Sequence, residues 1–198
     1  MSERPRIAVA VSGSGRSLRN LIERSRDGRL NAEVALTVAD RGKIKALEIS
    51  EEADVPVALL RPKKFEGPGA FSEAVFAAVE RQGCQLVVLA GFLRLLPIPE
   101  RWEGRVINIH PSLLPKHGGA GYYGDRVHEA VLASGDEESG CTVHYVDNQF
   151  DNGPPILQRK VPVLAGDSVD SLAKRVFAEE CEALPEAVER ALIAQTAG

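Results

Sequence analysis

The chain has 198 residues, of which 44% are hydrophobic and 26% charged, a composition typical of a globular protein with a sizeable core. Its net charge of -4 disfavours a general nucleic-acid-binding protein, which usually carries a basic surface. No apolar run is long enough to cross a bilayer, and the N-terminal residues lack the apolar core and cleavage site of a signal peptide. We therefore expect a cytoplasmic protein with no membrane or nucleic-acid partner.

The three cysteines, Cys84, Cys141 and Cys181, are odd in number and scattered along the chain. Neither their spacing nor that of the histidines matches a metal-ligand pattern. We expect reduced thiols that serve mainly as packing residues, and no bound metal.

Predicted strands and helices alternate along the chain. Apolar runs of strand length lie at 7–11, 33–39, 57–60, 86–90, 141–146 and 156–164, with another around Ile107. Helices are predicted from the first glycine turn to about Arg26, at 43–53, 70–82 and 127–134, and from Val169 onward, with a polar loop at 61–69. Asp167 or Ser168 is the expected N-cap of the last helix, which Pro185 should kink or divide.

This alternation predicts one α/β domain with a doubly wound, mostly parallel, Rossmann-like sheet. The short turn loop between the last two strands predicts an antiparallel edge. Within the single domain, residues 1–198, we expect a nucleotide- or phosphate-binding part at about 1–100, a catalytic part at about 86–165 and a C-terminal helix at about 168–196.

A glycine-rich turn joins the first strand to the first helix. Gly13 and Gly15 allow backbone N–H groups to approach an anion, the helix N-terminus favours negative charge, and Arg16 offers a charge-assisted contact. A dinucleotide site is an alternative, with Asp40 as the acid for a ribose, although Leu18 replaces the third glycine of that motif. A purely structural turn is the other alternative.

Two polar side chains interrupt the apolar run that ends before Pro111. Asn108 and His110 are two residues apart, so on a strand they point to the same face. The proline places them near the carboxyl end of the strand, where open α/β sheets bind ligands. They are either part of a site or hydrogen-bonded polar groups of the core.

Two loops have the composition expected beside such a site. The apolar segment 91–97 follows a fully apolar strand and suits a flat, partly apolar ligand, although it could equally be a core-packing loop. The segment 116–124 contains four glycines and is predicted to be a mobile loop that can close over a site.

One carboxylate lies on the apolar face of the last predicted helix. At 100° per residue, Glu180 falls among the apolar side chains Val169, Leu172, Ala173, Val176, Phe177, Cys181 and Leu184. A carboxylate in such a position needs a partner. It forms a salt bridge with a nearby Arg or Lys, or it lines a pocket that binds an amine.

With these residues in view, the chain resembles the folate-dependent formyltransferases along nearly its whole length. The resemblance rests on five segments: SGSG at 12–15, LAGFLR at 89–94, NIHPSLLPK at 108–116, GCTVHYV at 140–146 and FDNGP at 150–154. The NIHPSLLP block together with the downstream aspartate is highly specific to this superfamily and less specific among its members.

The resemblance implies transfer of a formyl group from 10-formyltetrahydrofolate to the amine of 5'-phosphoribosylglycinamide in purine synthesis, with small-molecule substrates, no metal and a monomer or homodimer. It implies a catalytic trio of Asn108, His110 and Asp151. It places the ribonucleotide at Gly13, Gly15, Arg16, Ser17 and Glu180. It places the folate at Leu93, Arg94, Leu95, Leu96, Asn108, Val146, Asp147 and Phe150.

In the expected chemistry, the amine attacks the formyl carbon directly. Asn108 and protonated His110 are suited to stabilise the oxyanion, and His110 to move protons. Asp151 orients His110 and favours its charged form, whereas His144 is expected to be structural or to support the trio.

The chain departs from the family pattern in three places. Many members have a small or polar uncharged residue in place of Arg16. The loop at 116–125 is longer and richer in glycine than the commonest form, although it resembles one branch of the family. At 67–69 the chain has Gly-Pro-Gly where some members carry a folate-contacting arginine.

Other readings remain open from the sequence. A formyltetrahydrofolate deformylase or another formyltransferase would share the trio, and a dinucleotide-binding module would share the glycine turn. A transfer RNA formyltransferase is disfavoured because those enzymes usually carry a further C-terminal domain and a basic surface.

Overall fold

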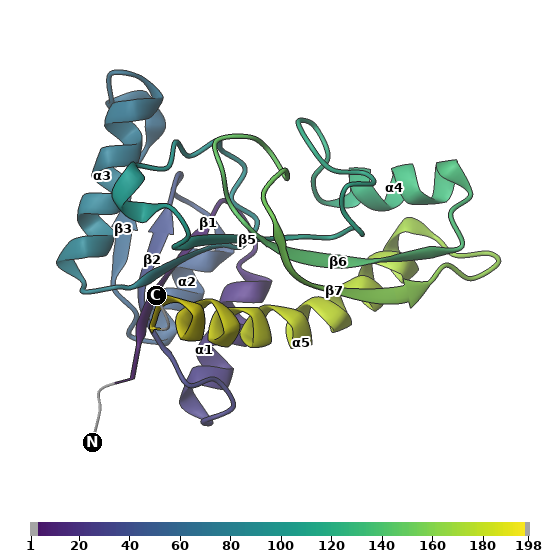
Figure 1. Cartoon of the computed structure of the whole chain (residues 1–198), viewed down its shortest axis with the longest axis horizontal. Helices are drawn as coiled ribbons and strands as arrows, with labels where there is room; N and C mark the ends of the chain where they lie inside the picture. Colours follow the sequence, from purple (N-terminus) through teal and green to yellow (C-terminus); the bar gives the residue numbers. More distant parts are fainter. Residues whose placement is uncertain (1–3, 197–198) are drawn as a thin grey trace.

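The computed structural model describes residues 4–196, which form one seven-stranded sheet covered by helices on both faces (Figure 1). The strands are β1 (Arg6–Val11), β2 (Glu33–Ala39), β3 (Val57–Leu59), β4 (Leu86–Leu89), β5 (Val106–His110), β6 (Glu138–Tyr145) and β7 (Pro155–Pro162). The helices are α1 (Arg16–Arg26), α2 (Lys45–Glu52), α3 (Gly67–Arg81), α4 (Asp125–Ser134) and α5 (Val169–Thr196), with 3₁₀ turns η1 (Pro62–Lys64) and η2 (Glu100–Trp102).

The sheet order is β3-β2-β1-β4-β5-β6-β7. The first five strands in this order are parallel, and β6 runs antiparallel to both β5 and β7. The predicted mostly parallel sheet with an antiparallel edge is therefore confirmed. The central strands β1 and β4 are apolar and almost wholly buried because helices cover both of their faces.

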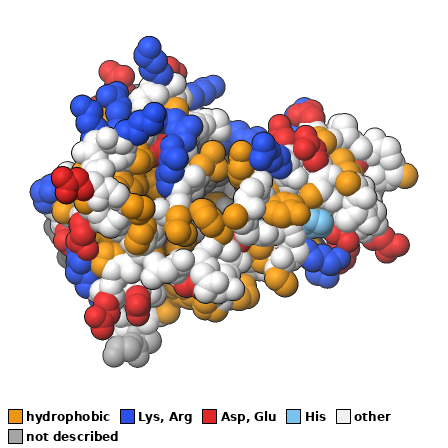
Figure 2. Space-filling view, turned by 90° about the horizontal axis from the view of Figure 1, so that it is seen from above, with side chains coloured by type: hydrophobic (Ala, Val, Ile, Leu, Met, Phe, Trp, Pro, Cys, Tyr) orange, Lys and Arg blue, Asp and Glu red, His pale blue; other side chains and the backbone are white. Residues whose placement is uncertain are grey.

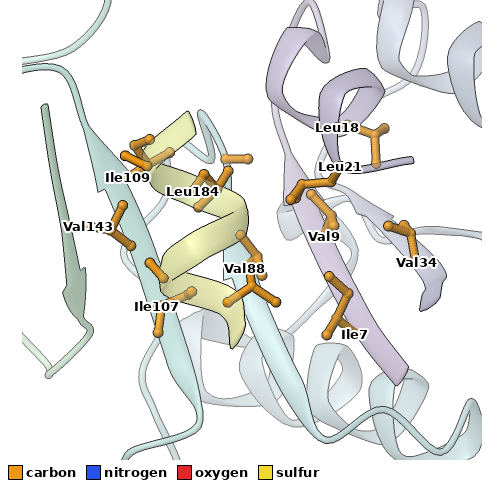
Figure 3. Packing of buried hydrophobic residues seen from close by; sticks show 14 of the residues in the cluster. Ile7, Val9, Leu18, Leu21, Val34, Val88, Ile107, Ile109, Val143 and Leu184 are labelled. Atoms are coloured by element: carbon orange, nitrogen blue, oxygen red, sulfur yellow. The ribbon is translucent and has the colours of Figure 1, made fainter. Parts of the chain in front are cut away.

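Two hydrophobic cores lie on opposite faces of this sheet. The first joins β1, β4, β5 and β6 to α1 and α5, and Figure 3 shows Leu184 of α5 between Ile109 of β5 and Val88 of β4. The second packs α3 and η2 on the other face, where Phe76 and Trp102 are in ring contact at 5.3 Å. Both cores anchor the carboxyl ends of β1, β4 and β5, where the site forms.

Two details of the predicted elements are wrong. The polar loop expected at 61–69 contains η1 and the start of α3, because Pro68 fits the first turn of a helix, where no backbone donor is required. Of the kink or division predicted at Pro185, the division is wrong, because α5 continues through this buried proline. The cap is confirmed, because Ser168 Oγ accepts a hydrogen bond from the Ser171 N–H at 3.1 Å.

No helix within residues 4–196 is long and apolar enough to span a membrane.

Candidate active site

A cleft of about 660 Å³ opens at the carboxyl ends of β1, β4 and β5. Figure 2 shows the upper side of the molecule, with hydrophobic side chains around a central hollow and Lys and Arg side chains along one rim. The cleft is lined by nearly all of the residues singled out from the sequence. These are Gly13, Gly15, Arg16, Ser17, Leu93, Arg94, Leu95, Leu96, Asn108, His110, Val146, Phe150, Asp151 and Glu180.

Asp147 is the one predicted site residue that does not line this cleft. It lines a separate hollow instead, together with residues such as Ile98, Arg105 and Gln195. Its carboxylate accepts hydrogen bonds from the Gln149 N–H at 2.8 Å and from Asn152 Nδ2 at 2.7 Å. The side chain therefore stabilises the turn of its own loop, which is the ordinary role of an aspartate at such a position.

The glycine turn brings the N-terminus of α1 to the cleft. Gly15 is the N-cap, and its φ of 72° lies in the left-handed region that favours glycine. A Cβ at this position would lie 2.8 Å from the Cα of Ala46 in α2. Within the described chain no side chain caps α1, so the N–H groups of its first turn are available to an anion.

Arg16 lies between this turn and α5. Its guanidinium is stacked over the Phe177 ring, 4.1 Å from the ring centre. Glu180 lies one turn further along α5 and lines the same cleft. The cleft therefore has a cation close to the anion-binding turn and a carboxylate further along.

The side-chain carboxylate of Glu180 makes no ion pair or hydrogen bond with any residue between 4 and 196, which overturns the salt-bridge alternative for this group. Arg24 pairs with Glu182 and Arg159 with Glu179, whereas Arg16, the cation whose charge acts on Glu180, is stacked on Phe177. Burial raises the pKa of Glu180 from 4.5 to about 7, and the charge of Arg16 only partly opposes this. An unpaired carboxylate at the wall of a cleft is suited to bind a cationic or hydrogen-bond-donating group.

The structure brings together the three residues predicted to be catalytic. Asn108 and His110 project from the end of β5, and Asp151 comes from the loop after β6 with a φ of 52°. Asp151 Oδ1 accepts from Asn108 Nδ2 at 3.3 Å, and Oδ2 lies 3.4 Å from His110 Nδ1. Oδ2 also accepts from the Gly119 N–H at 2.9 Å, which ties the glycine-rich loop to the trio.

Asp151 is ionised in this environment. Burial alone would raise the pKa of this carboxyl, but the neighbouring His144 and His110 and the Gly119 N–H hold it below its usual value. A carboxylate therefore faces His110 across the pH range in which the imidazole titrates.

His144 completes the cluster from β6. Its Nδ1 donates to the Tyr145 carbonyl at 2.8 Å, and its Nε2 lies 3.1 Å from Asn108 Nδ2 and 3.6 Å from Asp151 Oδ1. Asn108 Nδ2 thus donates to Asp151 and also contacts the His144 ring. The sequence suggested at most a supporting position for His144, and the structure places it in direct contact with the trio.

The neighbours of His110 have opposing effects on the pKa of its imidazole. Its Nε2 donates to the His117 carbonyl at 2.8 Å while Nδ1 faces Asp151, and both partners only accept. The contact with the carbonyl requires a proton on Nε2, and a second proton on Nδ1, which makes the ring an imidazolium, would face the Asp151 carboxylate. Burial lowers the pKa of His110 below 6.5, and Asp151 and the His117 carbonyl act against this effect. The ring can therefore change its charge during a reaction in the cleft.

The opposite wall of the cleft is apolar and exposed. Leu93, Leu95 and Phe150 are each between 43% and 45% exposed, which is unusual for large apolar side chains. Next to them, Arg94 Nε donates to the fully buried Asp40 at 2.9 Å, and Arg41 binds the same carboxylate at 3.0 Å. Asp40 is thus occupied by two arginines, which removes the ribose-binding acid from the dinucleotide alternative.

Sequence reasoning did not single out several residues that line or support the cleft. Tyr122, Tyr123 and His128 line it, and His128 is buried with no partner in the described chain for its Nδ1. His117 and Asp136 support it through contacts between segments distant in sequence. Only the glycine content of the 116–124 loop pointed to this region, because such pairings depend on the tertiary fold. The described residues contain no cluster of three or more His, Cys, Asp or Glu side chains suited to a metal ion.

The formyl transferase family model matches residues 5–188. The chain belongs to the formyl transferase family. Over 188 residues it is 39% identical to the chloroplastic phosphoribosylglycinamide formyltransferase of Vigna unguiculata, covering 94% of this chain and 60% of that protein. It is 35% identical to the trifunctional purine biosynthetic protein adenosine-3 of Bos taurus, covering 94% of this chain and 18% of that one. This family member thus spans less than two thirds of the length of these curated relatives.

Solved structures of family members have the same fold. Glycinamide ribonucleotide transformylase 1 from Symbiobacterium toebii is 37% identical with a TM-score of 0.87, over 95% of this chain and 87% of that chain. Phosphoribosylglycinamide formyltransferase from Bacillus halodurans is 32% identical with a TM-score of 0.85, over 94% and 95%. The resemblance to folate-dependent formyltransferases and the predicted fold class are therefore confirmed.

Proposed function

We propose that this chain transfers the formyl group of 10-formyltetrahydrofolate to the amine of 5'-phosphoribosylglycinamide, a step of purine synthesis. The observation that carries the proposal is the composition of one cleft. An uncapped helix N-terminus, an unpaired carboxylate, the Asn108–His110–Asp151 cluster and an exposed apolar wall all line it. Its relatives over nearly its whole length include a phosphoribosylglycinamide formyltransferase and a trifunctional purine biosynthetic protein.

The ribonucleotide fits the side of the cleft formed by α1 and α5. The phosphate would accept hydrogen bonds from the first-turn N–H groups after Gly15, with Ser17 beside them. Arg16 would add a charge-assisted contact if it turns away from Phe177. The glycinamide amine would lie near Glu180, whose carboxylate has no competing partner in the described chain.

The folate fits the apolar side. A cleft of about 660 Å³ is in the usual range for a small-molecule site, which is apolar with a few convergent polar groups. Leu93, Leu95 and Phe150 provide exposed surface for a flat ring system. The reactive end of the folate would point toward Asn108 at the end of β5.

The reaction needs no enzyme nucleophile. The amine nitrogen bonds to the formyl carbon, the bond from that carbon to the folate nitrogen breaks, and one amine proton is transferred to the folate nitrogen. Asn108 Nδ2 and the imidazolium of His110 stabilise the negative charge that develops on the formyl oxygen. Asp151 favours the charged form of His110, which holds and passes the proton.

The proposal is tested by following release of tetrahydrofolate from 10-formyltetrahydrofolate with and without the ribonucleotide. Release that requires the ribonucleotide supports the transferase. Equal release without it indicates hydrolysis of the formyl group, as in a deformylase. No release from folded protein would point to another acceptor or to a binding role. Cytoplasmic location and a monomeric or dimeric state stay predictions.

A further inference from the structure

An ion-pair cluster is formed by Lys116, Asp136 and His117, the residue whose carbonyl contacts His110. His117 Nε2 lies 2.8 Å from Asp136 Oδ2, and Lys116 Nζ lies 2.8 Å from Asp136 Oδ1. Asp136 follows the C-cap of α4, whereas Lys116 and His117 are in the loop that follows β5. The cluster therefore fastens the glycine-rich loop to the segment between α4 and β6.

The backbone of His117 is the part that reaches the site. Its carbonyl accepts the hydrogen bond from His110 Nε2 at 2.8 Å. His117 has a φ of 52°, a left-handed conformation that is uncommon for residues other than glycine. The side chain of His117 therefore contacts Asp136 while its carbonyl contacts His110.

The two ends of the cluster differ in exposure. The side chains of His117 and Asp136 are 14% and 17% exposed, whereas Lys116 is 68% exposed. An ion pair of an exposed lysine contributes little, so of the two ion pairs of Asp136 the one with His117 restrains the loop more. The pKa of Asp136 is lowered to about 2 by Lys116 and His117, so its carboxylate remains charged at neutral pH.

We propose that Asp136 is a positioning residue for the reaction: by holding His117, it places the carbonyl that orients His110 and stabilises the imidazolium. This inference rests on the proposed function, and none of the comparisons assigns a role to Asp136 or His117. Asp136 touches no reacting atom in this scheme, and its effect passes through one backbone carbonyl.

The charge of His110 depends on all of the groups around it. Asp151 faces it from the loop after β6, His144 from β6, His117 from its own loop and His128 from α4. The His117 carbonyl favours the charged ring, as Asp151 does, whereas burial and the other histidines disfavour it. Loosening the carbonyl therefore lowers the pKa of His110, and less imidazolium is present at neutral pH.

The decisive variant is Asp136→Asn, with Glu138→Gln as its matched control. Glu138 lies two residues after Asp136 and makes an exposed ion pair with Lys160. Its substitution therefore removes a carboxylate without removing a partner of His117. One hydrogen bond of ordinary net strength corresponds to a change of about two- to tenfold. We expect Asp136→Asn to lower kcat at pH 7.5 by about that factor, with KM for both substrates within about twofold of the wild type. Glu138→Gln should match the wild type.

The pH profile separates positioning from general damage. The limb on which kcat falls with rising pH should move to lower pH by about 0.3 to 1 unit in Asp136→Asn, because the imidazolium is the active form. His117→Ala should shift the pH profile in the same way, and it tests the proposal if Asp136→Asn fails to fold. His117→Gln keeps an N–H donor for Asp136 and should restore most of the activity. Profiles of Asp136→Asn and His117→Ala that coincide with the wild type would overturn the proposal.

A readout without turnover distinguishes this inference from the proposed function. The chain has four histidines, so the imidazole signals of His110 can be assigned by NMR from their loss in His110→Gln. The His110 titration should move to lower pH in Asp136→Asn and stay in place in Glu138→Gln. If the wild type transfers no formyl group, the proposed function fails and this titration still decides the inference. An unchanged His110 titration in Asp136→Asn would overturn it.

Discussion

Replacing Glu180 by glutamine should stabilise the fold while weakening the proposed function. Glu180 lines the cleft without a partner in the described chain, and its pKa is raised from 4.5 to about 7, chiefly by burial. Glutamine has nearly the same shape and cannot ionise. The variant therefore isolates the cost of holding a carboxylate at this position.

The magnitude follows from the difference between the folded and unfolded pKa values. Between pH 4.5 and about 7 the folded chain keeps the proton that the unfolded chain loses, so rising pH destabilises the folded state. At about 1.4 kcal/mol per pKa unit, the full cost above pH 7 is about 3 kcal/mol. Glu180→Gln should thus be more stable than the wild type by up to about 3 kcal/mol at pH 8, and by less than about 1 kcal/mol at pH 5.

The assay is denaturant unfolding of both proteins at pH 5, 6, 7 and 8. Glu182→Gln is the control, because that carboxylate is exposed, lies two residues further along and pairs with Arg24. It should change the free energy of unfolding by less than about 1 kcal/mol. Glu180→Gln should also raise KM for the ribonucleotide by about 10- to 100-fold, the effect of losing a hydrogen bond to a charged group. A variant no more stable than the wild type at pH 8 would refute the reasoning.

Three further substitutions test other parts of the site. His110→Ala should lower kcat by about 10²- to 10⁴-fold in the formyl-transfer assay, and full activity would remove His110 from the mechanism. Gly15→Ala should lower the melting temperature and raise KM for the ribonucleotide, because φ is 72° and the new Cβ would lie 2.8 Å from Ala46; unchanged values would contradict this. Asp40→Ala should release Arg94, raise KM for the folate and reduce stability by about 1–3 kcal/mol. Since the pKa of Asp40 is lowered in the fold, its contribution should be present at pH 7 and shrink as pH falls below 3.8, and a pH-independent loss would contradict it.

The central sheet could be predicted because its signal is local. The apolar runs of β1, β4 and β5 are buried on both faces, and each is bounded by a glycine or proline. The start of α3 could not be predicted, because a Gly-Pro-Gly sequence is typical of loops and begins a helix only where the following residues pack against the sheet. Pro185 remains inside α5 for a similar reason, since burial of the helix outweighs one missing hydrogen bond.

The residues of the cleft could be named from motifs, but their partners could not. The placement of Asn108 and His110 on one strand face follows from the two-residue period of a strand. The helical period placed Glu180 on the buried face, yet only the structure shows that the flanking arginines bind other carboxylates. Asp147 was predicted to contact the folate because it lies in the right loop, although its side chain turns back into that loop. The contacts of His117 and Asp136 depend on the packing of α4 and have no sequence signal.

The most direct test of the central claim follows the transferred carbon itself. The protein is mixed with 10-formyltetrahydrofolate that carries ¹³C in the formyl group and with 5'-phosphoribosylglycinamide, and the products are observed by ¹³C NMR. Direct transfer predicts that the labelled carbon appears as a formamide on the ribonucleotide, in an amount equal to the tetrahydrofolate released. Label recovered as free formate, or retained on the folate by active, folded protein, would contradict it.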